Sequence, residues 1–157
     1  MAVKYPFTQD IDTVWAALCD PDFRVARCEA LGETEVECEI EEDGDTVQVT
    51  VNRGIVRELP SFLAKLFNPK QQVMLVEHWQ KSGKGWEGKI AIEIKGQPVK
   101  LSGVCSLIAT ANGCEYTVDH SCKAKIPLVG GKVEKFVLSQ TDTSAIEELD
   151  YLKSHLV

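Results

Sequence analysis

Three polar residues, Arg53, Glu77 and His120, occupy strand positions where the alternating pattern predicts side chains that point inward. Burying such groups is unfavourable unless each finds a hydrogen-bond partner or water. Together they could supply the acid, the base and the anchoring charge of an enzyme. They could equally orient a ligand inside an apolar cavity, form a satisfied structural pair, or be turned outward by a bulge.

The two charged residues of this set belong to consecutive strands that we expect to pair. If Arg57 lies opposite Gln72, then Arg53 comes close to Glu77. Short loops favour antiparallel pairing of neighbouring strands, which makes this register geometrically possible. The sequence therefore predicts that the two opposite charges meet on the inner face of the sheet.

One segment, Gly83–Gly88, fits the G-x-G-x-x-G pattern of dinucleotide-binding proteins. In those proteins the pattern joins a strand to a helix whose N-terminus faces the pyrophosphate. Here it joins two predicted strands, so we interpret it as a hairpin turn. The chain also lacks a G-x-S-x-G elbow and an H-E-x-x-H helix, and motifs therefore give no support to an enzyme.

The cysteines show no C-x-x-C spacing and no histidine at ligand spacing. Free cysteine packs like a small apolar residue, so we expect buried thiols, no metal and no cofactor. The chain also lacks a signal-peptide pattern, from which we expect a cytoplasmic protein without disulfides. The remaining histidines, His78 and His155, are expected at the surface. The cysteines are Cys19, Cys28, Cys38, Cys105, Cys114 and Cys122.

Turn signals and changes of period predict a strand at 3–8, two short helices, six antiparallel strands between 33 and 124, and a long helix after Gly130. A helix of roughly 25 residues cannot bury its apolar stripe alone, so the sheet must cover it. We expect an α+β fold, a single domain over 1–157, with a seven-stranded curved sheet around that helix. The stripe comprises Val133, Phe136, Val137, Gln140, Ile146, Leu149, Leu152 and Leu156.

With these elements in place, several segments resemble the START-like superfamily, also called SRPBCC or helix-grip, which includes the birch pollen allergen. The similarity extends over the whole chain and is greatest to a bacterial branch classed as a domain of unknown function. The segment 125–134 is the most specific. The segments that carry the resemblance are Tyr5–Phe7 with Val14 and Trp15, 59–63, Glu77–Trp79, Gly96–Val99, and 125–134.

The resemblance implies a helix-grip fold with a cavity between the sheet and the C-terminal helix that holds lipids, sterols, hormones or polyketides. It assigns no catalytic residue. The apolar insert Leu59–Phe67 would then lie near the mouth of the cavity and could gate it. Small residues among the inward positions leave room for a ligand, although they fit a tightly packed core as well. The candidate ligand-binding residues are Arg53, Leu75, Glu77, Trp79, Ile92, Gly103, Cys105, Tyr116, His120, Phe136, Val137 and Gln140.

Three functions remain open. The first is noncatalytic binding or transport of a small hydrophobic, lipid-like or aromatic molecule. The second is a cavity enzyme of the cyclase, dehydratase or hydrolase type, using Arg53, Glu77 and His120. The third is a protein-interaction module that uses an acidic hairpin at 33–45.

The charge of the chain is concentrated in that hairpin. The formal net charge is −7, and nine acidic residues with no basic residue lie between Glu29 and Asp45. The acidic residues alternate with apolar ones, which is typical of a solvated outer strand face. We expect no nucleic-acid partner, because phosphate binding needs a basic face. No segment is apolar over 18 residues, so we also expect no integral membrane association.

Overall fold

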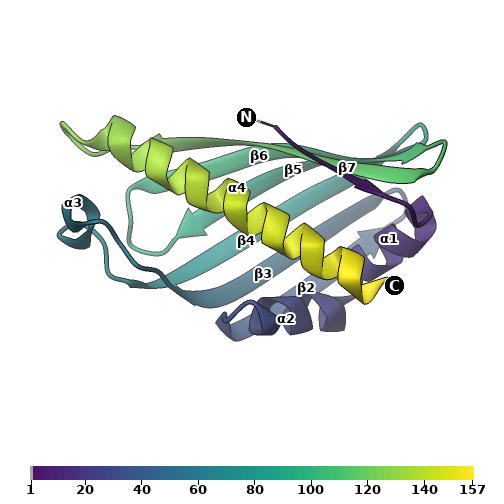
Figure 1. Ribbon diagram of the computed structural model, residues 1–157, viewed down its shortest axis with the longest axis horizontal. Helices are drawn as coiled ribbons and strands as arrows, with labels where there is room; N and C mark the ends of the chain where they lie inside the picture. The colour runs from purple at the N-terminus through teal and green to yellow at the C-terminus, as the bar shows by residue number, and fades with distance from the viewer. Residues whose placement is uncertain (1) are drawn as a thin grey trace.

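The computed structural model describes residues 2–157 and confirms the predicted α+β fold. One antiparallel sheet has seven strands in the order β1-β7-β6-β5-β4-β3-β2. The long helix α4 runs diagonally across the inner face of this sheet (Figure 1). The elements are β1 (Val3–Phe7), α1 (Ile11–Leu18), α2 (Pro21–Ala30), β2 (Thr34–Asp43), β3 (Thr46–Val56), α3 (Ser61–Ala64), β4 (Lys70–Ser82), β5 (Gly85–Ile94), β6 (Val99–Thr110), β7 (Gly113–Ala124) and α4 (Gly130–His155).

The two short helices begin where aspartates precede them. The Asp10 carboxylate accepts a hydrogen bond from the backbone N–H of Thr13 at 2.7 Å, and Asp20 does the same for Asp22 at 2.9 Å. Such caps satisfy N–H groups that have no partner inside the helix. Pro21 then occupies the first turn of α2, where its missing N–H is not needed.

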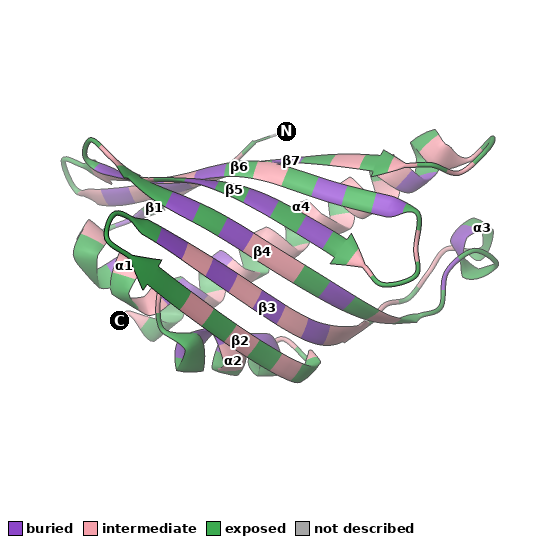
Figure 2. Ribbon diagram, turned by 180° about the vertical axis from the view of Figure 1, so that it is seen from behind, coloured by how far each residue is buried: buried purple, intermediate pink, exposed green. Residues whose placement is uncertain are grey.

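Burial alternates along the strands as the period of two predicts (Figure 2). In β2 the apolar positions are partly buried against α2, while the intervening glutamates are exposed. The predicted solvated acidic face is therefore confirmed. A protein partner for it stays a prediction. The exposed acidic residues of this strand are Glu35, Glu37, Glu39, Glu41, Glu42 and Asp43.

The edges of the sheet are irregular. At one edge, β2 shifts its register between Thr34 and Glu37, and Glu35 has a φ of 52°. This is a bulge, which interrupts the regular ladder of hydrogen bonds. At the other edge, β1 has only 5 residues and includes Pro6, which has no N–H to donate.

Two apolar clusters hold α4 at its two ends. Near its C-terminus, Leu149 and Leu152 belong to the main core together with α1, α2 and the sheet. Near its N-terminus, Val133 packs in a second cluster with Leu63 and Phe67 from the insert that contains α3. Between these clusters no residue of α4 is fully buried. The helix therefore bridges the sheet rather than packing on it over its whole length.

Two sequence-based expectations about this arrangement are wrong. Ile146, placed on the buried stripe, is 44% exposed, because at 3.6 residues per turn it lies on the opposite side of α4 from Thr141, Ser144 and Glu148, which face the cavity. The strand register also differs: Arg53 lies opposite Val73, and Glu77 lies opposite Val49. The connection through α3 is longer than a simple turn. The last hydrogen bond between the two chain segments runs from the backbone N–H of Arg57 to the carbonyl of Pro69.

None of the helices in residues 2–157 is both long and apolar enough to cross a membrane.

Candidate functional site

A cavity lies between the two apolar clusters, bounded by α4, α2, the α3 insert and the inner face of the sheet. The empty space between its lining atoms, together with the solvent at its open mouth, has a volume of about 1300 Å³. Of this, about 100 Å³ is open to the centre of a water-sized sphere. A single buried water needs only about 10–15 Å³ by the same measure, so the cavity has room for a larger molecule.

The floor of the cavity is aliphatic. Val51, Leu75 and Ile92 lie side by side on β3, β4 and β5, in the middle of the sheet. Leu75 is only partly buried although its neighbours cover it on both sides, because the cavity lies directly above it. Further apolar side chains come from β6, β7, the insert and α4, among them Leu101, Val118, Leu63, Phe67, Phe136 and Val137.

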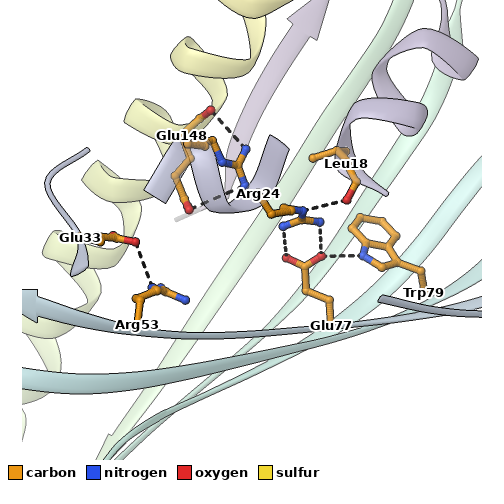
Figure 3. A network of polar contacts seen from close by, with 8 residues as sticks. Leu18, Arg24, Glu33, Arg53, Glu77, Trp79 and Glu148 are labelled. Carbon is orange, nitrogen blue, oxygen red and sulfur yellow. Dashed lines mark hydrogen bonds and ion pairs between the residues drawn. The ribbon is translucent and has the colours of Figure 1, made fainter. Parts of the chain in front are cut away.

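At one end of the cavity, Arg24 and Glu77 form a buried ion pair (Figure 3). The two terminal nitrogens of Arg24 donate to the carboxylate at 2.8 and 3.1 Å, and its Nε donates to the carbonyl of Leu18 at 2.8 Å. Trp79 Nε1 donates to the same carboxylate at 2.8 Å. Burial alone would raise the pKa of Glu77, but the Arg24 charge and these hydrogen bonds hold it below its usual range.

Two further arginines have looser acidic partners (Figure 3). Arg27 reaches Glu148 of α4, with 3.8 Å between Nη2 and the carboxylate and 3.3 Å between Nη1 and the backbone carbonyl. Arg53 Nε lies 3.3 Å from Glu33 Oε1, but at an angle that makes no hydrogen bond. Burial raises the pKa of Glu33 despite the attraction of Arg53. The Nε atoms of both arginines are buried without a hydrogen-bond acceptor in residues 2–157.

The fourth arginine, Arg57, has no carboxylate partner in the described part of the chain. Its Nη1 makes one long hydrogen bond, 3.4 Å, to Oε1 of Gln140 on α4. Burial and the like charge of Arg53 lower the pKa of Arg57. Arg53 lies on β3 and Arg57 directly follows the end of this strand, with Ile55 between them in the two-residue alternation, and both arginines line the cavity.

His120 lines the cavity from β7. Its Nδ1 lies 3.1 Å from Oδ1 of Asp142 on α4, so the pair ties the helix to the sheet. Tyr116, on the same face of β7, is also buried beside the cavity.

The sequence of the chain matches one family model. The family model described as "Protein of unknown function (DUF2505)" matches residues 2–156. The chain belongs to this family. Among curated proteins, none is significantly similar in sequence.

Similar solved structures include two bacterial proteins. An uncharacterised protein from Rhizobium leguminosarum aligns with a TM-score of 0.59 at 9% identity, over 99% of this chain and 92% of that chain. A conserved protein from Geobacillus kaustophilus aligns with a TM-score of 0.52 at 13% identity, over 99% of this chain and 91% of that chain. At such low identity the likeness concerns the fold alone.

Most of the residues predicted for the site lie around the cavity. The exceptions are Trp79, Gly103 and Cys105, which lie outside it. Trp79 packs instead at right angles to Trp15, with 5.2 Å between the ring centroids. The predicted residues that line the cavity are Arg53, Leu75, Glu77, Ile92, Tyr116, His120, Phe136, Val137 and Gln140.

The structure does not join Arg53, Glu77 and His120 into one group. Arg53 faces Glu33, Glu77 is held by Arg24, and His120 faces Asp142. The predicted meeting of Arg53 with Glu77 is wrong, because the actual register places them four residues apart along the paired strands.

Sequence reasoning also missed several cavity residues. Arg57 follows Arg53 and Ile55 at the period of two, so continuing the alternation would have found it. Arg24 and Arg27 lie three residues apart on the buried face of α2, a helical spacing that places two charges against the core. Nothing in the local sequence marks Glu33 or Glu148, whose role depends on how distant elements pack.

Proposed function

We propose that this protein binds a small hydrophobic molecule, lipid-like or aromatic, in the cavity between the sheet and α4, without catalysing a reaction. The observation that carries the proposal is the partly buried aliphatic floor around Leu75 in the middle of the sheet. A concave, mostly apolar site with a few polar groups is the usual form of a small-molecule site.

The arrangement of the polar groups supports binding over chemistry. Glu77 already accepts three hydrogen bonds from Arg24 and Trp79, so its carboxylate is not poised to take a proton from a ligand. The sequence resembles the START-like superfamily, whose members usually have a cavity for apolar ligands between the sheet and the C-terminal helix. This resemblance supports the proposal. The position of α4 supports the same proposal, because the helix packs on β7 while Gln140, Ser144 and Glu148 face the cavity above the middle strands.

Binding of the neutral apolar dye N-phenyl-1-naphthylamine tests this proposal. We expect saturable fluorescence enhancement with one dye per chain, because burial of apolar surface drives binding. In the variant Leu75→Trp the larger side chain fills the floor of the cavity, and we expect the dye signal to be lost.

The matched control is Val104→Trp, which adds the same side chain at an exposed position of β6. This variant should bind the dye as the wild type does. Circular dichroism establishes that both variants are folded. The proposal is wrong if the wild type gives no saturable signal, or if Leu75→Trp binds the dye as well as Val104→Trp does.

A further inference from the structure

The cavity wall contains more positive than negative charge. Each of three carboxylates, Glu33, Glu77 and Glu148, faces its own arginine, which leaves Arg57 without a carboxylate partner among residues 2–157. The His120–Asp142 contact lies apart from this series. With these four arginines and three carboxylates ionised, the arginine wall carries a net charge of +1, and Glu33 and Glu147 attract the charge of Arg57 without forming an ion pair with it.

Arg53 and Arg57 also retain unused hydrogen-bond donors. Arg53 is 9% exposed, its Nε has no acceptor, and none of the hydrogen bonds within residues 2–157 involves its terminal nitrogens. Arg57 uses only Nη1, in a bond of 3.4 Å. Arginine presents a planar set of donors that matches a carboxylate, and buried donors are normally satisfied.

The two side chains can reach a common point. Arg57 follows the last residue of β3 in the same two-residue alternation as Arg53, and a chain extended at the rise of a strand would place their Cα atoms about 13 Å apart. Their long side chains shorten this separation, and the charge of Arg53 is near enough to lower the pKa of Arg57. Gln140 on α4 faces Arg57 from across the cavity.

We infer that the ligand of this cavity is an amphipathic carboxylic acid, with its carboxylate held by Arg57 and Arg53 and its apolar body on the floor around Leu75. This inference rests on the proposed function and narrows its ligand class. A single negative charge would balance the wall and accept the unused donors. The apolar body would be an aliphatic chain or an aromatic ring system.

Competition with N-phenyl-1-naphthylamine tests the inference with matched pairs of compounds at neutral pH. Decanoate is compared with 1-decanol, and 2-naphthoate with 2-naphthol, so that the two pairs distinguish aliphatic from aromatic acids. Hydrophobicity alone favours each alcohol, because the ionised acid prefers water. We expect at least one acid to bind about tenfold more tightly than its alcohol, since hydrogen bonds to charged groups contribute strongly.

Variants locate the carboxylate. Arg57→Gln should bring the ratio of acid affinity to alcohol affinity down to one or below, whereas Arg57→Lys should keep part of the preference for the acid. Lys89→Gln removes one positive charge at an exposed position of β5 and should change neither affinity.

The outcomes separate the two proposals. If the dye and all four compounds fail to bind, the proposed function falls and this inference falls with it. If the alcohols bind as tightly as the acids in the wild type, or if Arg57→Gln keeps the preference, only the inference is overturned. The wild-type comparison decides the matter even if a variant does not fold.

Discussion

Removing both partners of the Arg24–Glu77 pair should destabilise the protein by much less than the sum of the two single removals. The side chains of Arg24 and Glu77 are 4% and 6% exposed, so neither charge can be solvated by water after its partner is lost. In Glu77→Leu the Arg24 guanidinium keeps only the carbonyl of Leu18, and Trp79 Nε1 loses its acceptor. Breaking a buried pair in this way costs about 3–5 kcal/mol.

The double variant Arg24→Met with Glu77→Leu removes both charges and replaces them with apolar groups of similar volume. Such replacements are often close to neutral, because the cost of desolvating two ions disappears. The unsatisfied Trp79 N–H and Leu18 carbonyl remain, at about 1–3 kcal/mol each if water does not reach them. We therefore expect the loss in the double variant to be smaller than the sum of the two single-variant losses by about 4 kcal/mol.

Urea unfolding followed by far-UV circular dichroism gives the free energy of unfolding for the wild type, both single variants and the double variant. Glu87→Leu, at an exposed position of β5, is the control and should change it by no more than about 0.5 kcal/mol. The reasoning fails if Glu77→Leu lowers the free energy of unfolding by less than about 1 kcal/mol. It also fails if the decreases measured for the two single variants simply add in the double variant.

The same pair predicts a pH dependence. Because Arg24 and the hydrogen bonds hold the pKa of Glu77 below its ordinary value of 4.5, ionised Glu77 contributes stability above that value. The contribution should disappear as the pH falls through the lowered pKa. The stability difference between the wild type and Glu77→Leu should therefore shrink in acid. A difference that stays constant down to the acid transition would contradict this assignment.

Three other changes have distinct expected results. Arg57→Gln should raise the free energy of unfolding of the ligand-free protein by about 0.5 kcal/mol, because it removes a half-buried charge. If urea unfolding instead shows a decrease of more than about 1 kcal/mol, Arg57 has a structural role. Glu33→Gln should strengthen decanoate binding up to about fivefold by freeing Arg53. Because the pKa of Glu33 is raised, the stability of the wild type relative to Glu33→Gln should fall as the pH rises through that pKa. Unchanged decanoate binding would contradict the first expectation, and a stability difference independent of pH would contradict the second. Gly88→Ala should cost about 1–3 kcal/mol, because a Cβ there would lie 2.7 Å from the sulfur of Cys105, whereas Gly131→Ala meets nothing within 4 Å, and equal melting temperatures of the two variants would refute this.

The sequence predicted the elements well because local rules determine them. The alternation in β2 and the turn at Asp43–Gly44 specify a hairpin without reference to the rest of the chain. Asp10 and Pro21 likewise mark helix starts through contacts within a few residues. These features depend on backbone geometry and side-chain period, which a single sequence records directly.

The partners of the buried charges could not be predicted in the same way. Glu77 pairs with Arg24, a residue 53 positions away on a helix whose approach to the sheet no local pattern fixes. The predicted β3–β4 register was wrong because the α3 insert contains no tight turn that would fix the register. Ile146 on α4 was also misplaced, because the buried face of this helix includes polar residues such as Thr141, Ser144 and Glu148, which an apolar stripe does not reveal.

The irregular edges of the sheet have a consequence for behaviour at high concentration. Exposed edge strands can pair with strands of other molecules and so start aggregation. Here the bulge at Glu35 and the row of glutamates disturb one edge, while the shortness of β1 and its Pro6 weaken the other. A curved sheet that stays open around a cavity thus resists joining to its copies. Replacing the exposed glutamates of β2 with threonine should therefore increase light scattering by concentrated solutions, since it removes charges that oppose edge-to-edge pairing.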